Sequence, residues 1–295
     1  MPELPDVTVY VERIKAVVGD RPLWTLRVIN PFILRSVEPH PAELSGKRLA
    51  DVRRLGKRIV LAFEHDLFVV IHLMIAGRLR WRPPEKKLPG KLALAAFEFE
   101  HGKLWLTEAG KTRRASLFIV RGESALRDHD RGGIEPLRVT RAEFIERLRF
   151  ENHTLKRTLT DPRLFSGIGN AYSDEILHRA RLSPMAQSRK LSEGDATRLH
   201  EATVVTLDEW TSRLRAQVGD GFPEEVTAFH EEMAVHGRYG KPCPVCGAPV
   251  QRIRYATNET NYCARCQTGD RLLADRALSR LLKEDWPRSL DELDA

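Results

Sequence analysis

The spacing of apolar positions changes near residue 140, so the chain divides into a strand-rich first part and a helix-rich second part. In the first part, apolar residues alternate or run together and are rich in β-branched and aromatic types, which predicts strands. The expected strands are Leu23–Ile29, Arg58–Glu64, Leu67–Leu73, Leu92–Glu100 and Lys103–Thr107. The residues Glu100-His101-Gly102-Lys103 predict a hairpin turn between the last two strands.

Helical spacing marks one early segment and most of the chain after Gly132-Gly133. The early helix is expected over Val7–Val18, and its N-terminus would favour anions such as phosphate near Pro2. The later helices are expected at Ala142–Arg149, Arg157–Leu164, Ala171–Arg181, Glu193–Val218 and Asp270–Asp285. Before the last of these, Cys243–Cys266 is typical of a compact, hairpin-like unit.

These patterns predict a multi-domain α+β protein. Several short strands and one early helix favour a β-sandwich or barrel-like domain with flanking helices over residues 1–135. The predicted bounds continue with a helical domain over 136–235, the cysteine unit over 236–268 and a helical extension over 269–295.

The charge and the cysteine positions narrow the function classes. A net charge of +7 favours a polyanionic partner, nucleic acid first and an acidic membrane surface second. The sequence contains neither a membrane-spanning apolar run nor a signal-peptide core. All 4 cysteines fall in one late window, which favours a metal site in a reducing, cytoplasmic compartment over a disulfide framework.

The cysteine spacing has a specific chemical interpretation. Cys243-x-x-Cys246 and Cys263-x-x-Cys266 fit a zinc site with four thiolate ligands. A closed shell of thiolates leaves no open coordination position, so the predicted metal is structural. The alternative, two pairs of reduced buried cysteines, does not explain the spacing.

The opening residues Met1-Pro2-Glu3 carry a second candidate chemistry. Removal of Met1 would leave Pro2 as a secondary amine, whose pKa lies far below that of lysine. Such an amine can attack an aldehyde-like carbon and form an iminium, and the Glu3 carboxylate can move a proton or stabilise the charge. The alternative is that Pro2 and Pro5 only stiffen an irregular N-terminus.

Two polar stretches are candidates for phosphate binding. Gly167-Ile168-Gly169-Asn170 places a tight turn before a helix, which suits an anion cradle, although Asn170 could equally be a simple cap. The run Arg53–Arg58 contains Lys57, which could project from a turn toward a phosphate or a reacting sugar. The alternative for this run is a solvated basic face.

His72-Leu73-Met74 ends an apolar run. Met74 could enter a base stack as an exposed apolar wedge, although a methionine in this position is more often part of a core.

Together these residues resemble one family, over about residues 1–267. Met1-Pro2-Glu3-Leu4-Pro5, Lys57, the His-Leu-Met stretch, Gly167–Asn170 and the four-cysteine unit are similar in order and spacing to formamidopyrimidine-DNA glycosylase / endonuclease VIII proteins. The resemblance implies an N-terminal β-sandwich, a helix–two-turn–helix domain and a zinc finger. It also implies a monomeric, bacterial, nucleoid-associated base excision repair enzyme that binds double-stranded DNA containing damaged bases or abasic sites.

The resemblance assigns roles to individual residues. Pro2 would attack the sugar C1′, Glu3 would be the acid/base carboxylate, and Lys57 would contact the phosphate beside the lesion. Lys156 would lie near the lesion. The remaining expected DNA-binding residues are Asn170, Gly167, Gly169, Met74, Arg113, Arg114 and Arg254. The flipped base would be removed, and β- or β,δ-elimination would then nick the strand.

The chain departs from the family pattern in three places. Asn258 stands where the family's zinc finger usually has an arginine, and Arg252 or Arg254 could substitute for it. The loop Glu108–Ser116 has arginines but lacks the family's phenylalanine, and residues continue after the last cysteine from Thr268 to Ala295. We therefore expect a divergent member with an altered lesion preference.

Two other functions are compatible with parts of the sequence. A zinc-containing protein that binds damaged DNA with little or no base excision would explain the altered finger loop, but it would not need Pro2, Glu3 and Lys57. A basic RNA- or ribosome-binding zinc protein would explain the charge and the cysteines, but not the opening residues.

Overall fold

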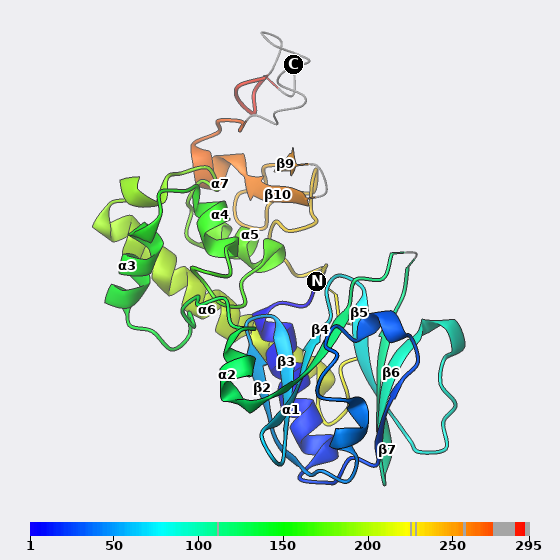
Figure 1. Cartoon of the computed structure of the whole chain (residues 1–295). Helices are drawn as coiled ribbons and strands as arrows, with labels where there is room; N and C mark the ends of the chain where they lie inside the picture. Colours follow the sequence, from blue (N-terminus) through cyan, green and yellow to red (C-terminus); the bar gives the residue numbers. More distant parts are fainter. Residues whose placement is uncertain (111, 225, 228, 256–257, 274–286, 293–295) are drawn as a thin grey trace. The chain divides into compact units, whose positions relative to one another are not determined.

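The computed structural model describes residues 1–110, 112–224, 226–227, 229–255, 258–273 and 287–292 (Figure 1). The contacts divide the chain into two compact units. The N-terminal unit comprises Met1–Arg131 and Trp210–Thr227, and the C-terminal unit comprises Gly132–Glu209 and Ala228–Ala295. The predicted domain bounds stay a prediction, but Trp210–Thr227 groups with the N-terminal unit, which the sequence did not indicate.

The described part of the N-terminal unit contains helix α1 and two four-stranded antiparallel sheets, ordered β1-β6-β7-β5 and β2-β3-β4-β8. The elements are α1 (Leu4–Val18), β1 (Thr25–Val28), η1 (Pro31–Ile33), η2 (Pro41–Leu44), β2 (Leu49–Leu55), β3 (Arg58–Phe63), β4 (Leu67–His72), β5 (Gly77–Arg82), η3 (Gly90–Leu92), β6 (Ala93–Phe99), β7 (Gly102–Glu108), β8 (Ser116–Arg121) and α2 (Gly122–Arg127). Buried residues of both sheets and α1 form one core cluster. The predicted sheet-rich N-terminal domain is confirmed.

The predicted hairpin between β6 and β7 is confirmed, because Phe99 pairs with Gly102 across the turn. Gly102 is required there, since an added Cβ would lie 2.1 Å from the Trp81 ring. Strands β2, β5 and β8 were not predicted. Charged residues interrupt the apolar pattern of β2, whereas β5 carries a period-two alternation and β8 a short apolar run that the sequence analysis did not use.

The described part of the C-terminal unit is mainly helical and contains a small two-stranded sheet, β10-β9. Its elements are α3 (Arg141–Phe150), α4 (Leu155–Thr160), α5 (Asn170–Arg179), η4 (Ser188–Lys190), α6 (Glu193–Val218, whose last residues belong to the N-terminal unit), β9 (Val250–Tyr255), β10 (Asn258–Cys263) and α7 (Ala264–Thr268). The hairpin-like cysteine unit is therefore confirmed. Within the described ranges, no helix is both long and apolar enough to cross a bilayer.

Two helix predictions need correction, and a third lies mostly outside the described residues. Helix α1 begins at Leu4, earlier than predicted, because Pro5 suits the first turn of a helix. The predicted helix Arg157–Leu164 is wrong in its bounds: α4 ends at Thr160, and Asp161 is extended because Pro162 follows it. The predicted helix Asp270–Asp285 falls almost wholly outside the described residues.

Candidate functional site

The N-terminus leads directly into α1 and is held by two carboxylates. Glu3 is the N-cap residue of α1 and forms a reciprocal capping box with Asp6. The Glu3 backbone N–H donates to Asp6 Oδ2 at 2.8 Å. Pro2, Glu3 and Asp6 are all buried. The helix terminus that the sequence offered to phosphate is therefore capped by the chain's own Glu3.

Burial and four charged side chains set the protonation of the amino terminus. Burial lowers the pKa of the Met1 amine, and the Arg78 and Lys57 cations lower it further, whereas Glu3 and Asp6 raise it. Burial also raises the pKa of Asp6 to about 7. The charges of the predicted residues Glu3 and Lys57 thus both act on the Met1 amine, together with those of Asp6 and Arg78, which sequence reasoning missed.

Lys57 lies in the tight turn between β2 and β3, beside Gly56, whose φ is 60°. The other cations of this run are engaged elsewhere. Arg53 lies on β2, where it pairs with Glu123 and sits 5.2 Å from the centre of the Phe68 ring. Arg58 Nη1 donates to the His129 carbonyl at 2.5 Å. Arg53 thus lies on a partly exposed face, as the alternative for this run predicted, whereas the charge of Lys57 acts on the Met1 amine.

The turn between β4 and β5 presents a different apolar side chain from the one predicted. Met74 has a left-handed backbone (φ 53°) and is half-buried, whereas the next residue, Ile75, is 60% exposed. Gly77 is required at the end of this turn, because an added Cβ would lie 2.2 Å from the Leu73 carbonyl oxygen. Because Met74 and Ile75 are adjacent in the sequence, either side chain could have been expected at the tip of this turn.

The loop before β8 carries the two predicted arginines, Arg113 and Arg114, and both are exposed. Buried Glu108 fixes the end of this loop by accepting the Arg114 N–H at 3.0 Å and the Ala115 N–H at 3.2 Å. Arg113 donates to the Lys91 carbonyl. Glu108 is a supporting residue that the sequence alone did not reveal.

In the C-terminal unit, the glycine turn leads into α5 as predicted. Gly167 has a φ of 79°, Ile168 is buried as an anchor, and Gly169 is the N-cap of α5. Asn170 begins the helix, and its Nδ2 donates to the Glu259 carbonyl at 2.8 Å. Lys156 Nζ donates to the Asn170 carbonyl at 2.7 Å, so the predicted Lys156 and Asn170 do lie together.

Lys156 and Asn170 line an open pocket with a volume of about 540 Å³. Its lining consists of Asn152, His153, Thr154, Lys156, Arg157, Thr160, Asn170, Met185, Gln187 and Thr260. Polar side chains and two cations dominate this lining, which suits an anionic backbone better than an apolar ligand.

A buried carboxylate, Asp174, supports this pocket. Its Oδ1 accepts from Lys156 Nζ at 2.5 Å, and its Oδ2 contacts His236 Nδ1 at 2.8 Å and accepts the Asn261 N–H at 3.2 Å. The neighbouring Glu175 accepts three backbone N–H groups from residues 234–236 at 2.7–2.9 Å. Two consecutive acids on a buried helix face were the sequence signal for this network.

The four cysteines meet at the hairpin β9–β10. The Sγ atoms of Cys243, Cys246, Cys263 and Cys266 all lie within 4.8 Å of one another. The Cys246–Cys263 and Cys243–Cys266 Sγ separations are 3.4 and 3.9 Å, close to the edge of about 3.8 Å expected for a tetrahedron with Zn–S bonds of about 2.3 Å. The donor set therefore fits zinc.

Two polar side chains brace the cysteine site. His178 Nε2 lies 3.3 Å from Cys243 Sγ, where its N–H can donate to a thiolate that binds metal. Gln267 accepts the Cys263 N–H at 2.8 Å and donates to the Leu182 carbonyl at 2.9 Å. The site is thus tied to α5 and to the segment that follows it.

The finger hairpin partly neutralises the arginines that were expected to grip phosphate. Arg252 lies 3.7 Å from Glu259 and 4.0 Å from the centre of the Tyr239 ring. Arg254 is exposed and lies opposite Glu259 in the β9–β10 register. The Glu259 carboxylate therefore reduces the positive charge of this hairpin.

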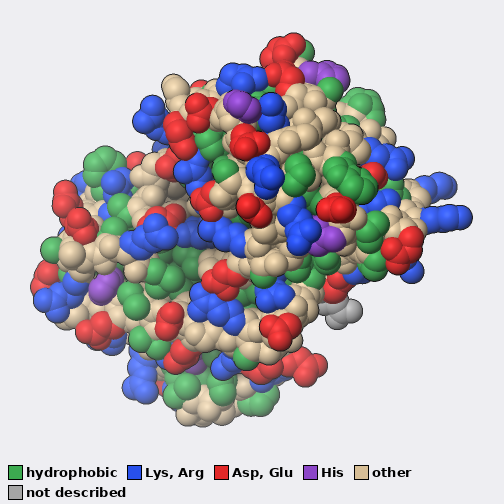
Figure 2. Space-filling view, turned by 90° about the horizontal axis from the view of Figure 1, so that it is seen from below, with side chains coloured by type: hydrophobic (Ala, Val, Ile, Leu, Met, Phe, Trp, Pro, Cys, Tyr) green, Lys and Arg blue, Asp and Glu red, His purple; other side chains and the backbone are tan. Residues whose placement is uncertain are grey.

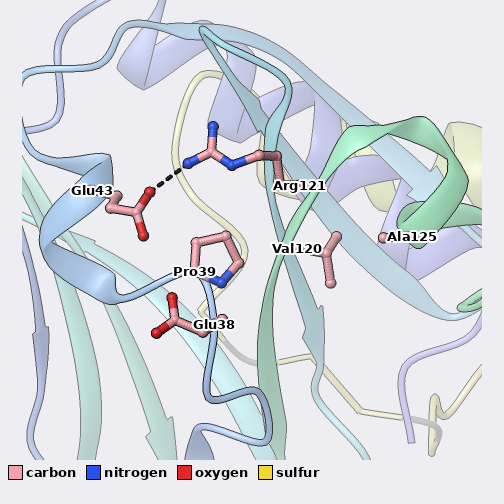
Figure 3. A pocket seen from close by; sticks show the side chains of 6 residues that line it. All are labelled: Glu38, Pro39, Glu43, Val120, Arg121 and Ala125. Carbon is pink, nitrogen blue, oxygen red and sulfur yellow. Dashed lines mark hydrogen bonds and ion pairs between the residues drawn. The ribbon is translucent and has the colours of Figure 1, made fainter.

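The predicted site residues lie outside the second pocket, and the charges on one face of the molecule are mixed. Figure 2 shows Lys and Arg side chains interspersed with Asp and Glu on the displayed face. The second pocket, of about 420 Å³, lies in the N-terminal unit and is lined by Glu38, Pro39, Glu43, Val120, Arg121 and Ala125 (Figure 3). None of the predicted site residues is among these lining residues, and the Arg121–Glu43 ion pair occupies one wall.

Comparison with known proteins covers most of the chain. Residues 1–115 match the formamidopyrimidine-DNA glycosylase N-terminal domain, residues 133–214 match the formamidopyrimidine-DNA glycosylase H2TH domain, and residues 240–269 match the zinc finger found in FPG and IleRS. The formamidopyrimidine-DNA glycosylase of Thermus thermophilus is 34% identical over 281 residues, which span 90% of this chain and 98% of that protein. The enzyme of the same name from Aromatoleum aromaticum is 33% identical over 285 residues, spanning 90% and 99%.

A solved structure shares the fold. The Lactococcus lactis Fpg in complex with DNA containing an abasic site superposes with a TM-score of 0.78 at 23% identity, covering 90% of this chain and 99% of that one. The zinc-finger match and the four-cysteine cluster together indicate zinc binding.

Proposed function

The chain belongs to the formamidopyrimidine-DNA glycosylase / endonuclease VIII family, and we propose that it excises damaged, oxidised bases from double-stranded DNA and then cleaves the strand. The observation that carries this proposal is the N-terminus. The Met1 amine, which directly precedes the buried Pro2, has a pKa lowered by burial, and the charges of Glu3, Asp6, Lys57 and Arg78 all act on it. A nucleophilic amine needs this kind of setting, because only its unprotonated form attacks carbon.

The first step is displacement of the base. With Met1 removed, the Pro2 nitrogen attacks C1′ of the flipped nucleotide, and the bond between C1′ and the base breaks. The electron pair of that bond leaves with the base, which takes up a proton, and Glu3 assists the proton transfers. Opening of the sugar ring leaves an iminium between Pro2 and C1′.

The second step is strand cleavage. The iminium acidifies the C2′ proton, and its removal forms a C2′–C3′ double bond as the C3′–O bond breaks and the 3′ phosphate leaves. Repetition at the other phosphate gives β,δ-elimination. Water then hydrolyses the iminium, which releases the aldehyde and restores the Pro2 amine.

The other site residues bind DNA in this proposal. Lys57 contacts the phosphate beside the lesion, and Lys156 lies near the lesion. Asn170 and the backbone N–H groups around Gly167 and Gly169 bind a phosphate. The remaining contacts come from Met74, with its exposed neighbour Ile75, and from Arg113, Arg114 and Arg254.

One structural zinc ion held by the four cysteines maintains the finger, since four thiolates close its coordination shell. His178 and Gln267 hold the ligand loops in place. We also propose that the protein acts as a monomer in the reducing bacterial cytoplasm, at the nucleoid, where its DNA substrate lies.

Borohydride trapping on a duplex with an abasic site tests the proposal. Borohydride reduces the iminium, so wild-type protein should become covalently linked to DNA, and Pro2→Gly should lose most of this product. Mass spectrometry must first show that Met1 is absent and that zinc is bound. Processed, zinc-loaded wild-type protein that yields no trapped complex would contradict the enzyme proposal.

A second candidate function has one observation in its favour. Glu259 pairs with Arg252 and so weakens the binding of phosphate by the finger. A protein that binds damaged DNA without excising the base could tolerate this weaker contact. Retained affinity for abasic DNA without any trapped complex would favour this alternative. Tighter binding to structured RNA than to damaged duplex DNA would instead favour an RNA-binding function.

A further inference from the structure

Two neighbouring cations of α4 line the pocket of the C-terminal unit, and they are bonded very differently. Lys156 and Arg157 both contribute to the lining. Consecutive residues of a helix point about 100° apart, so the two side chains leave α4 in different directions. The Lys156 side chain is only 12% exposed, whereas Arg157 is an exposed residue. The pocket therefore has one cation turned into the protein and one turned toward solvent.

The charge of Lys156 is used inside the fold. Its Nζ donates to Asp174 Oδ1 at 2.5 Å and to the Asn170 carbonyl at 2.7 Å. The Asp174 side chain is 0% exposed, so the carboxylate balances the ammonium where water does not reach it. These two bonds tie α4 to the first turns of α5. Lys156 and Asp174 thus form a pair without net charge that anchors Asn170, and the pair offers little attraction to an anion.

The Arg157 guanidinium is not used in this way. Within the described residues, neither a hydrogen bond nor an ion pair engages it. Its charge acts on Asp161, but that carboxylate is held by Arg163, whose Nε and Nη2 donate to it at 3.1 and 2.6 Å. His153, a third basic residue of the lining, contacts Glu151 Oε2 at 2.7 Å. Arg157 therefore keeps its donors and its charge for a ligand.

The rest of the lining suits a phosphate group. No acidic residue is among the described lining residues. Hydroxyl and amide side chains that can donate to phosphate oxygens come from Asn152, Thr154, Thr160, Gln187 and Thr260. An arginine adds a fixed positive charge and two parallel N–H donors, a geometry that matches two oxygens of one phosphate.

We propose that Arg157 is the residue through which this pocket neutralises a phosphate of the DNA backbone, and that Lys156 is a positioning residue that holds Asn170. The proposal rests on the proposed function, because it takes duplex DNA as the ligand of the pocket. It adds Arg157 to the DNA-binding residues and separates the two cations by task. One charge binds the ligand, and the other is balanced by Asp174.

The test measures how the affinity for DNA depends on salt. Each phosphate contact by a cation releases counterions, so its loss lowers the slope of log K against log salt by about 0.9. The ligand is a duplex with a tetrahydrofuran analogue of an abasic site, which lacks the reactive aldehyde, and Kd is measured from about 50 to 200 mM KCl. Arg157→Gln and Arg157→Lys are compared with Arg141→Gln. Arg141 is the matched control, because it is an exposed arginine of α3 in the same unit and does not line the pocket.

We expect Arg157→Gln to weaken binding about fivefold at the lowest salt and to lower the slope by about 0.9. Arg157→Lys should keep the wild-type slope, since a lysine also neutralises phosphate. Arg141→Gln should match wild type. Urea unfolding of Arg157→Gln should keep the wild-type midpoint, because this exposed guanidinium bonds to no other described residue.

A charge-balanced double variant tests the role of Lys156. Lys156→Met combined with Asp174→Asn removes both charges of the buried pair, so the net charge of the pocket does not change. The double variant should bind DNA more weakly than wild type, since Asn170 loses its anchor, but with the wild-type salt dependence. A slope lowered by about 0.9 would show that Lys156 itself contacts phosphate and would overturn the proposal.

Two results with the single variants would also overturn it. An unchanged slope in Arg157→Gln would mean that Arg157 makes no phosphate contact. An equal loss in Arg141→Gln would reduce the effect to net charge. Failure of the proposed function looks different: wild-type protein would bind the duplex with its full salt dependence but give no borohydride-trapped complex on abasic-site DNA, and the comparison of slopes would still decide the role of Arg157. Wild-type protein that binds no duplex would contradict both.

Discussion

Two buried aspartates in the two units show opposite ways of accommodating a charge. Asp6 lies in the first turn of α1, and Asp174 lies in the first half of α5, and both are nearly inaccessible to solvent. Asp6 accepts one backbone N–H, from Glu3. Asp174 instead contacts Lys156, His236 and the Asn261 N–H, at 2.5, 2.8 and 3.2 Å.

The difference follows from the cost of burying an ion. A buried carboxylate must either gain partners or take up a proton. Burial raises the pKa of Asp6 to about 7, so the N-terminal site retains a group that changes charge near neutrality. Asp174 is surrounded by donors, which fix Lys156 and the finger strand. The proposed site for chemistry and the proposed scaffold for DNA binding thus differ in how their buried acids are partnered.

The largest expected effect is that of zinc removal, which should affect the finger and spare the N-terminal unit. The core cluster of the finger contains Cys243 and Cys263, and structural zinc contributes about 10–16 kcal/mol to folding of isolated fingers. Chelation should therefore abolish the hydrogen-exchange protection of β9 and β10. Amides of α1 and β4 should keep theirs, because those elements pack in the sheet core of the N-terminal unit. Protected finger amides in zinc-free protein would contradict the structural role of the metal.

Removal of Asp174 should have the next largest effect. Asp174→Ala leaves the half-buried Lys156 and the buried His236 without their carboxylate partner, and such a loss costs about 3–5 kcal/mol. Denaturant unfolding should show this loss. Glu209→Ala is the matched control, because it removes an exposed partner of Arg179 on the same helix α5 and should cost less than about 1 kcal/mol. If both variants lost the same unfolding free energy, Asp174 would contribute no more to stability than an exposed ion pair does.

Asp6→Asn should raise the free energy of unfolding, in contrast to Asp174→Ala. Because the folded pKa of about 7 is raised from 3.8, the unfolded chain releases this proton more readily than the folded one. The stabilising effect of the protonated carboxyl is complete below about pH 3.8 and is lost as pH rises through about 7. Asparagine stays neutral and keeps an acceptor for the Glu3 N–H.

The variant should therefore gain on the order of 2–4 kcal/mol over wild type at pH 8. The gain should shrink toward pH 5. Urea unfolding of both proteins at pH 5 and 8 measures it, and the difference between them cancels the pH dependence of the zinc site. A constant difference at both pH values would mean that Asp6 does not titrate in this range.

The sequence predicted those features that depend on short-range spacing. Helix α6 has its predicted bounds, and the cysteine pairs meet as their spacing required. The glycine turn before α5 also has its predicted place. In each case the residues that determine the structure are neighbours in the chain, so one sequence contains the whole signal.

The supporting residues could not be predicted because their partners are far apart in the chain. The charge of Arg78 on β5 acts on Asp6 of α1, and Asp174 joins Lys156 to Asn261. Strand β5 is rich in arginine, and two of these arginines are held by Glu224, which lies far along the chain. The exposed tip at Ile75, beside the predicted Met74, depends on one left-handed residue that the sequence does not mark.

The smallest expected effect concerns the finger loop. Glu259 lies 3.7 Å from Arg252, and both side chains are about one-third exposed, so this pair contributes less than about 1 kcal/mol to stability. Glu259→Gln should leave unfolding unchanged but bind duplex DNA about twofold to threefold more tightly, since a charge that repels phosphate is gone and Arg252 is released. Affinities measured from 50 to 200 mM salt should show a steeper salt dependence than wild type. Unchanged affinity and salt dependence would mean that the finger makes no phosphate contact through Arg252. The pocket at Lys156 and Asn170 would then be the part of the C-terminal unit that binds DNA.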